Sequence, residues 1–180
     1  FVAHPYHHPT IGWKSDIERM TPDGLREYYD TFYWPNNATL SIVGQFDRGE
    51  TLGQVAEHFG DIDKAPQEIP QVTTEEPEQS GLRRVTVRQD GQLGAVLMGF
   101  KSPPALDADS DVLDVLARIL ASGKGSRLFQ RCTDRGLTSD VFAINFRLRD
   151  PGLFSVFAYL APDQDHETVE NAIHDTIADV

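Results

Sequence analysis

Three histidines within five residues, His4, His7 and His8, are the side chains whose type and spacing first suggest chemistry. Imidazole is a common zinc ligand, and the segment mimics the zinc pattern His-x-x-Glu-His. That pattern works on a helix, which brings the outer histidines to one side with the glutamate beside them as general base. Here Pro5 and Pro9 argue against a helix, and His7 occupies the position of the base. We therefore expect a proline-fixed surface or packing segment rather than a metal site.

The other candidate groups are isolated along the chain. His58, His166 and His174 have no cysteine or second histidine at ligand spacing. We expect solvated helix faces for His58 and His174, and His166 at the start of the last helix. Cys132 is the single cysteine, so it forms no internal disulfide, and the simplest interpretation is a buried small apolar side chain. Residues 123–126, Gly-Lys-Gly-Ser, lack the spacing of a phosphate loop and predict a turn between helices. No Gly-x-Ser-x-Gly elbow occurs either.

These patterns predict no catalytic residue and no metal ligand in the chain, and they leave substrate-binding residues unknown. The charge of the chain also limits the kinds of partner that it can bind. The 180 residues carry a net charge of -12, which disfavours nucleic acid and anionic membrane surfaces. No apolar stretch approaches the roughly 20 residues of a membrane span. Apolar residues make up 39% of the chain, enough for a folded core.

The first third of the chain predicts two helices and one strand. Thr21-Pro22-Asp23 is a typical helix start, and the apolar spacing of the following residues predicts a helix to Phe32. Residues 39–43 alternate as a strand, and residues 52–59 have helical spacing that ends at Gly60. Residues 61–81 then lose every apolar period and gain prolines and glutamates, which is typical of a linker between domains.

A second unit starts near Leu82, and its apolar pattern predicts the following elements. Strands are expected at 85–87, 93–100, 141–147 and 153–160, and helices at 112–120, around 128–129 and from 166 to the last residue. The run 93–100 is mostly apolar, which predicts a central strand. The chain starts without methionine and ends inside a helical pattern, so we expect a fragment. The expected fold class is α+β, with parts of two homologous domains of mixed, mainly antiparallel sheet packed with helices.

Several strings in fixed order resemble one family. They are Ala3-His4-Pro5-Tyr6, Tyr33-Trp34-Pro35-Asn36-Asn37-Ala38, Val43-Gly44-Gln45-Phe46-Asp47, Gly125-Ser126-Arg127-Leu128-Phe129-Gln130 and Gly136-Leu137-Thr138-Ser139-Asp140-Val141. Together they resemble the pitrilysin/insulinase family of zinc metallopeptidases, the inverzincins. The resemblance is strongest to the short bacterial and mitochondrial-processing-peptidase-like members, and it runs along nearly the whole chain.

The resemblance implies a particular domain plan. Such proteins hold two or more homologous domains that close around an unfolded peptide, and their zinc ligands lie before the Ala-His-Pro-Tyr segment. Residues 1–60 would then be the C-terminal part of the zinc-type domain without its ligands. Residues 61–81 would be the interdomain linker, and 82–180 a non-catalytic second domain truncated at its C-terminus. Zinc is expected in the full-length parent and none in this piece.

One departure from the family pattern concerns an arginine and a tyrosine that help many members hold the scissile carbonyl. Ser139 stands where the tyrosine is expected, and neither Arg131 nor Arg135 aligns cleanly with the arginine. In paired members, one chain brings zinc and the other brings this pair. Because the tyrosine is missing, our hypothesis is that the parent is the chain that brings zinc in such a pair.

The function implied by the resemblance is a fragment of a zinc-dependent metalloendopeptidase that acts on unfolded peptides. This piece would supply structure and possible peptide binding, and would be inactive alone. The alternative is a catalytically inactive assembly or peptide-holding subunit of the same fold. Expected partners are an unfolded peptide substrate and a homologous subunit or a second copy, with no nucleic acid and no membrane. By analogy the compartment is the bacterial periplasm, with the cytoplasm as the alternative.

Overall fold

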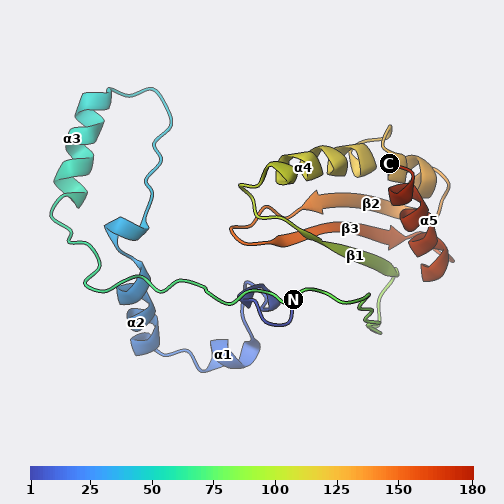
Figure 1. Cartoon of the computed structure of the whole chain (residues 1–180), viewed down its shortest axis with the longest axis horizontal. Helices are drawn as coiled ribbons and strands as arrows, with labels where there is room; N and C mark the ends of the chain where they lie inside the picture. Colours follow the sequence, from blue (N-terminus) through green and yellow to red (C-terminus); the bar gives the residue numbers. More distant parts are fainter. The chain divides into compact units, whose positions relative to one another are not determined.

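The secondary structure of the first 82 residues is entirely helical, whereas the rest of the chain forms a sheet covered by helices. The computed structural model describes residues 1–180 as two units, Phe1–Leu82 and Arg83–Val180 (Figure 1). The first unit holds η1 (Pro5–His7), α1 (Lys14–Glu18), α2 (Pro22–Phe32), η2 (Pro35–Asn37) and α3 (Arg48–Phe59). None of the helices in either unit is both long and apolar enough to cross a membrane.

Side-chain caps explain where the two longer helices of the first unit begin. The Thr21 hydroxyl accepts a hydrogen bond from the Gly24 N–H at 3.2 Å, and Pro22 follows as the first helical residue. The Asp47 carboxylate accepts from the Glu50 N–H at 2.8 Å and so caps α3. Each cap satisfies an N–H that has no partner inside its helix. The helices predicted to end at Phe32 and Phe59 are confirmed.

Two predicted strands are wrong. Residues 39–43 and 85–87 run without strand pairing, although their apolar alternation is that of a strand. A strand exists only when a neighbour satisfies its backbone N–H and C=O groups, and these segments have no such neighbour. In consequence Leu40 and Ile42 remain exposed in the first unit.

The second unit is built on a three-stranded antiparallel sheet in the order β1-β3-β2. Its strands are β1 (Ala95–Ser102), β2 (Thr138–Asn145) and β3 (Gly152–Leu160). They confirm the strands predicted at 93–100, 141–147 and 153–160. The prediction that 93–100 is the central strand is wrong, because β3 occupies the centre and β1 lies at an edge. The α+β fold class is confirmed.

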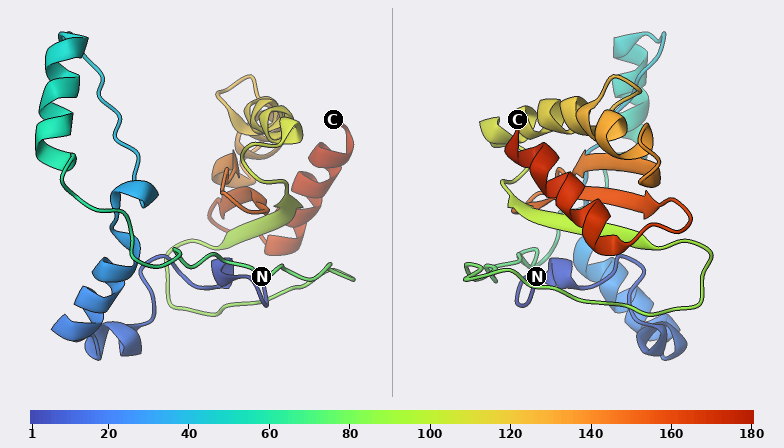
Figure 2. Two further views of the ribbon diagram at one scale, coloured as in Figure 1. Left: turned by 60° about the vertical axis from the view of Figure 1, so that its left-hand side comes forward. Right: turned by 90° about the vertical axis from the view of Figure 1, so that its right-hand side faces the viewer.

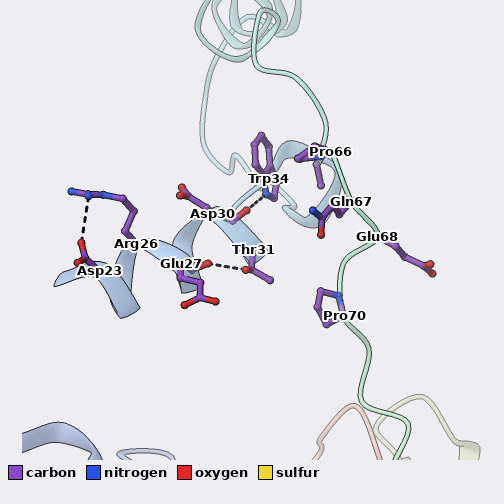
Figure 3. A pocket seen from close by; sticks show the side chains of 11 residues that line it. Asp23, Arg26, Glu27, Asp30, Thr31, Trp34, Pro66, Gln67, Glu68 and Pro70 are labelled. Atoms are coloured by element: carbon purple, nitrogen blue, oxygen red, sulfur yellow. Dashed lines mark hydrogen bonds and ion pairs between the residues drawn. The ribbon is translucent and has the colours of Figure 1, made fainter. Parts of the chain in front are cut away.

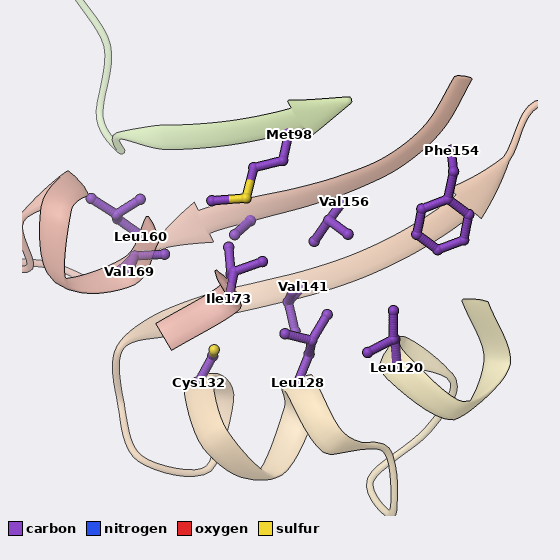
Figure 4. Close-up of a cluster of buried hydrophobic side chains, with 11 residues drawn as sticks. Met98, Leu120, Leu128, Cys132, Val141, Phe154, Val156, Leu160, Val169 and Ile173 are labelled. Atoms are coloured by element: carbon purple, nitrogen blue, oxygen red, sulfur yellow. The ribbon is translucent and has the colours of Figure 1, made fainter. Parts of the chain in front are cut away.

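Helices cover one face of this sheet (Figure 2). They are α4 (Ala108–Ala121), the π-helical turn η3 (Phe129–Thr133) and α5 (His166–Ala178). Alternate residues of β3 point into the core beneath them: Phe154, Val156, Ala158 and Leu160 are all buried. They pack with Leu120 of α4, Leu128, Cys132 of η3, and Val169 and Ile173 of α5 (Figure 4). This cluster is the hydrophobic core of the second unit.

Two neighbouring residues of α4 offer a matched test of this core. Leu120 is fully buried, whereas Ile119 is 43% exposed. Truncation of Leu120 removes buried methyl groups and leaves a cavity, so Leu120→Ala is expected to lower the free energy of unfolding by about 2–5 kcal/mol. Ile119→Ala is expected to cost roughly 0.5 kcal/mol or less, as surface changes do. Urea unfolding followed by circular dichroism measures both changes. Equal losses of unfolding free energy would show that α4 does not turn Leu120 toward the core and Ile119 away from it.

Candidate functional site

The histidine-rich turn at the start of the chain uses its rings as local hydrogen-bond partners. His4 is buried, and its Nδ1 accepts a hydrogen bond from the Tyr6 N–H at 3.2 Å. Nδ1 of His7 lies 2.8 Å from the His4 carbonyl oxygen, and the Trp13 indole N–H donates to Nδ1 of His8 at 2.9 Å. One nitrogen of each ring is therefore engaged within the turn.

This turn does not fit a zinc centre. Pro5–His7 forms a single 3₁₀ turn, not the α-helix that presents two imidazoles on one side. No group of three or more His, Cys, Asp or Glu side chains in the structure is placed to hold a metal ion. The remaining histidines are dispersed: His58 lies in the last turn of α3, and His166 and His174 lie on α5. No metal-dependent step is assigned to these residues.

Cys132 lies in η3 within the hydrophobic core and is fully buried. Burial raises the pKa of its thiol above the usual range, an effect that the charges of Arg131 and Arg135 partly oppose. Because the thiolate is the reactive form, this cysteine is a packing residue and a poor nucleophile. The sequence-based interpretation of Cys132 as a small apolar side chain is confirmed.

The Gly-Lys-Gly-Ser segment connects α4 to the next helical turn, as predicted. Gly123 has φ of +78°, a conformation that favours glycine, and the buried Ser126 hydroxyl donates to the Gly123 carbonyl at 2.7 Å. The hydrogen-bonding capacity of this serine is used to close the turn. The Ser126 N–H also donates to the Gly123 carbonyl, at 3.1 Å, so both polar groups of this serine serve the turn.

Ser139, at the position where the family's tyrosine is expected, lies in β2, and Arg131 lies in η3. Ser139 lies exposed at a β-bulge in β2, and its hydroxyl donates to the Tyr159 carbonyl at 3.3 Å. Arg131 instead bonds the Asp179 carboxylate at 2.5 Å, and the Arg127 guanidinium donates to the Asp179 carbonyl at 2.6 Å. Both arginines thus fix the end of α5. Arg131 and Ser139 thus make their hydrogen bonds to different partners, Asp179 and Tyr159.

A hollow of about 710 Å³ in the first unit was not anticipated from the sequence. It lies between α2 and the segment 65–70 (Figure 3). Its charged lining comprises four carboxylates and one guanidinium: Asp23, Glu27, Asp30, Glu68 and Arg26. Arg26 pairs with Asp23 at 3.8 Å, and the Trp34 indole N–H donates to the Asp30 carbonyl at 2.6 Å. The hollow is acidic and no imidazole lines it. Its one hydroxyl, that of Thr31, donates to the Glu27 carbonyl at 2.7 Å, so the hollow offers no hydrolytic constellation.

A polar cluster ties α4 to β2 in the second unit. The buried Asn145 amide donates to the Ser110 carbonyl at 3.1 Å and to the Ser110 hydroxyl at 3.0 Å. Arg147 bonds Asp114 at 2.8 Å and Asp111 at 2.7 Å. The hydrogen bond from Arg147 holds the pKa of Asp114 below its usual range. The cluster positions a helix rather than a substrate, because its charged groups are paired with one another.

Comparison with known proteins identifies the class to which this arrangement belongs. The model of the Peptidase M16 inactive domain matches residues 19–180. The chain belongs to this family of peptidase-like domains, and the resemblance to the pitrilysin/insulinase proteins is confirmed. The match runs across the boundary between the two units.

Particular relatives agree in sequence and in structure. Zinc protease PqqE of Helicobacter pylori is 31% identical over 176 residues, which cover 96% of this chain and 40% of the relative. The crystal structure of a protease from the same species superposes with a TM-score of 0.94 at 30% identity, covering 99% of this chain and 44% of that one. A peptidase M16 inactive domain from Pseudomonas fluorescens has the same fold, with a TM-score of 0.85 at 19% identity, 97% coverage of this chain and 42% of that one. This chain spans about two fifths of these relatives.

The reactivity of the Cys132 thiol tests whether this residue is buried and serves in packing. With no exposed surface and a raised pKa, it is expected to react with a thiol reagent at pH 8 at least about a hundredfold more slowly in the folded chain than in urea. Absorbance from a chromogenic disulfide reagent follows the reaction. The unfolded chain is the internal control, and equal rates in both states would contradict the burial described.

Proposed function

We propose that this chain is a non-catalytic part of a zinc-dependent metalloendopeptidase that cleaves unfolded peptides. Membership of the Peptidase M16 inactive domain family carries the proposal, together with the 31% identity to a relative named zinc protease PqqE. In this proposal the parent supplies the zinc-bound water that hydrolyses the peptide, and residues 1–180 supply structure around the peptide. The assignment of residues 1–60 to a zinc-type domain stays a prediction.

The exposed apolar side of the first unit supports a role within a longer protein. Leu25, Tyr28 and Tyr29 on α2 are each more than half exposed, although their spacing is that of a core-facing helix. Leu40 and Ile42 are also exposed, on a segment that has strand alternation but no partner strand. Large apolar side chains exposed at helix and strand spacing are typical of surfaces that another part of a protein covers. In the proposal, the remainder of the parent covers it.

The second unit is suited to hold an extended peptide beside the catalytic part. Its sheet has two edge strands, β1 and β2, each with one hydrogen-bonding side that no strand of this chain fills. An extended peptide adds to such an edge through its backbone, independently of most of its side chains. This is the binding mode we propose for an unfolded substrate. A homologous subunit or a second copy is the proposed assembly partner.

The proposal is tested on the full-length parent. The purified parent is expected to contain zinc and to cleave an unfolded, fluorescence-quenched peptide. Removal of zinc with a chelator is expected to abolish cleavage, and added zinc to restore it. Residues 1–180 alone, with zinc added at the same concentration, are the control and are expected to leave the peptide intact.

Two outcomes of this experiment would contradict the proposal in different ways. Zinc-dependent cleavage that tracks residues 1–180 through purification would refute their non-catalytic role. A parent that lacks zinc and cleavage but still binds the peptide would favour the alternative, an inactive peptide-holding subunit of the same fold. Family membership does not separate these two functions, so the metal content of the parent is the deciding measurement.

A substitution on α2 tests whether the apolar side of the first unit is covered in the parent. Leu25→Ser is expected to change the stability of residues 1–180 by less than about 1 kcal/mol, because Leu25 is already 53% exposed. In the full-length parent the same change is expected to cost about 2–3 kcal/mol, the loss of a buried leucine side chain. Glu27→Ser on the same helix is the control for helix propensity. Equal effects of Leu25→Ser in both proteins, measured by chemical unfolding, would count against the covered interface.

A further inference from the structure

A single carboxylate receives three consecutive backbone N–H groups in the first unit. The Val2 N–H lies 2.8 and 2.9 Å from the two oxygens of Glu76, and the N–H groups of Ala3 and His4 lie 2.9 and 3.0 Å from Oε2. The Glu76 side chain is only 9% exposed. Successive N–H groups that converge in this way form a concave anion receptor, and hydrogen bonds to an ionised acceptor are among the stronger ones in proteins.

The His-Pro-Tyr turn builds this receptor. His4 ends the receptor and is also the N-cap of η1, where its Nδ1 accepts from the Tyr6 N–H. The His4 ring is buried against Tyr6, with ring centroids 4.3 Å apart, and Pro5 restricts the backbone immediately after it. The backbone of residues 2–4 is thereby held in place. The motif that resembled a metal site in the sequence instead shapes a receptor for a carboxylate of the same chain.

Glu76 belongs to the segment 61–81, which has no helix or strand. A first attachment of this segment lies at Ala65, whose N–H donates to the Asn36 side chain at 2.8 Å. Glu76 attaches it again eleven residues later, to a part of the chain more than 70 residues away in sequence. The neighbouring residues Glu75 and Glu78 are exposed to solvent, unlike the Glu76 side chain. The buried carboxylate is thus distinguished from the charges that surround it.

We propose that Glu76 anchors the segment 61–81 to the His-Pro-Tyr turn and confines the flexible joint of the chain to residues 77–82. The segment as far as Glu76 then moves with the first unit, and only the six residues that follow adjust when the units move. The anchor rests on contacts within Phe1–Leu82, and the far end of the joint is the last residue of that unit. The proposal therefore stands or falls independently of the proteolytic function proposed above.

The test compares residues 1–180 with the variants Glu76→Gln and Glu76→Ala. Glu76→Ala removes the acceptor, and the amide hydrogens of Ala3 and His4 are expected to exchange with solvent roughly tenfold faster or more. Glu76→Gln keeps one acceptor oxygen without the charge, so a smaller acceleration is expected. In the unchanged chain, NMR order parameters of residues 71–76 are expected to match those of α2, and those of residues 78–82 to fall below about 0.6. Both variants are expected to extend the low values back toward Pro70.

Matched controls come from the same segment. Glu75→Gln and Glu78→Gln remove an identical charge within two residues and are expected to leave the exchange of Ala3 and His4 and the order parameters unchanged. Equal effects of all three glutamine variants would overturn the proposal, as would uniform order parameters across 66–82 in the unchanged chain. Unaltered amide signals from α2 show that a variant keeps its first unit folded. If Glu76→Ala loses them, Glu76→Gln decides the question by the same criteria.

Discussion

The central strand β3 is the constraint on which the second unit depends. It hydrogen-bonds to β1 on one side and to β2 on the other, so all three strands share its register. Its inward residues, from Phe154 to Leu160, also form the floor on which α4, η3 and α5 pack. Burial of this apolar face is the main favourable free energy available to a unit of this size. Both the sheet order and the helix positions thus follow from one strand.

No comparable constraint exists in the first unit. Its helices are well capped, but the apolar sides of α2 and of residues 39–43 find no sheet to cover them. What holds its distant segments together is polar: the Glu76 carboxylate on residues 2–4 and the Asn36 side chain on Ala65. The two units therefore differ in the physical source of their order. An apolar core organises one, and specific hydrogen bonds across long sequence separations organise the other.

Local signals were enough to predict most elements from the sequence. Thr21-Pro22 marks the start of α2 because capping depends on three or four adjacent residues, and apolar periodicity located α4 and α5. Sheet order does not follow from such signals: the apolar run of β1 predicts a central strand, yet β1 lies at the edge of the sheet. The residues of β3 that pair with β1 lie 50 to 64 residues further along the chain, so periodicity within one strand carries no information on its neighbours.

The same limit applies to the candidate site. Proline placement was enough to argue that His4, His7 and His8 do not share a helix, because that argument is local. The sequence does not predict that Glu76 binds this turn. Glu76 is one of three glutamates within four residues, and nothing in its immediate neighbours distinguishes it. Burial and long-range contact alone set it apart.

The bulge in β2 has a consequence for how this fold accepts variation. Thr138 faces Leu160 and Asp140 faces Tyr159, so Ser139 is an additional residue on its strand. As a result Thr138 and Val141 both point into the core, while Ser139 and Asp140 both point away from it. Position 139 is thereby uncoupled from core packing, and a side chain of any size can be exchanged there without changing the interior. A protein lineage can gain or lose a functional group at this position while it keeps the same scaffold.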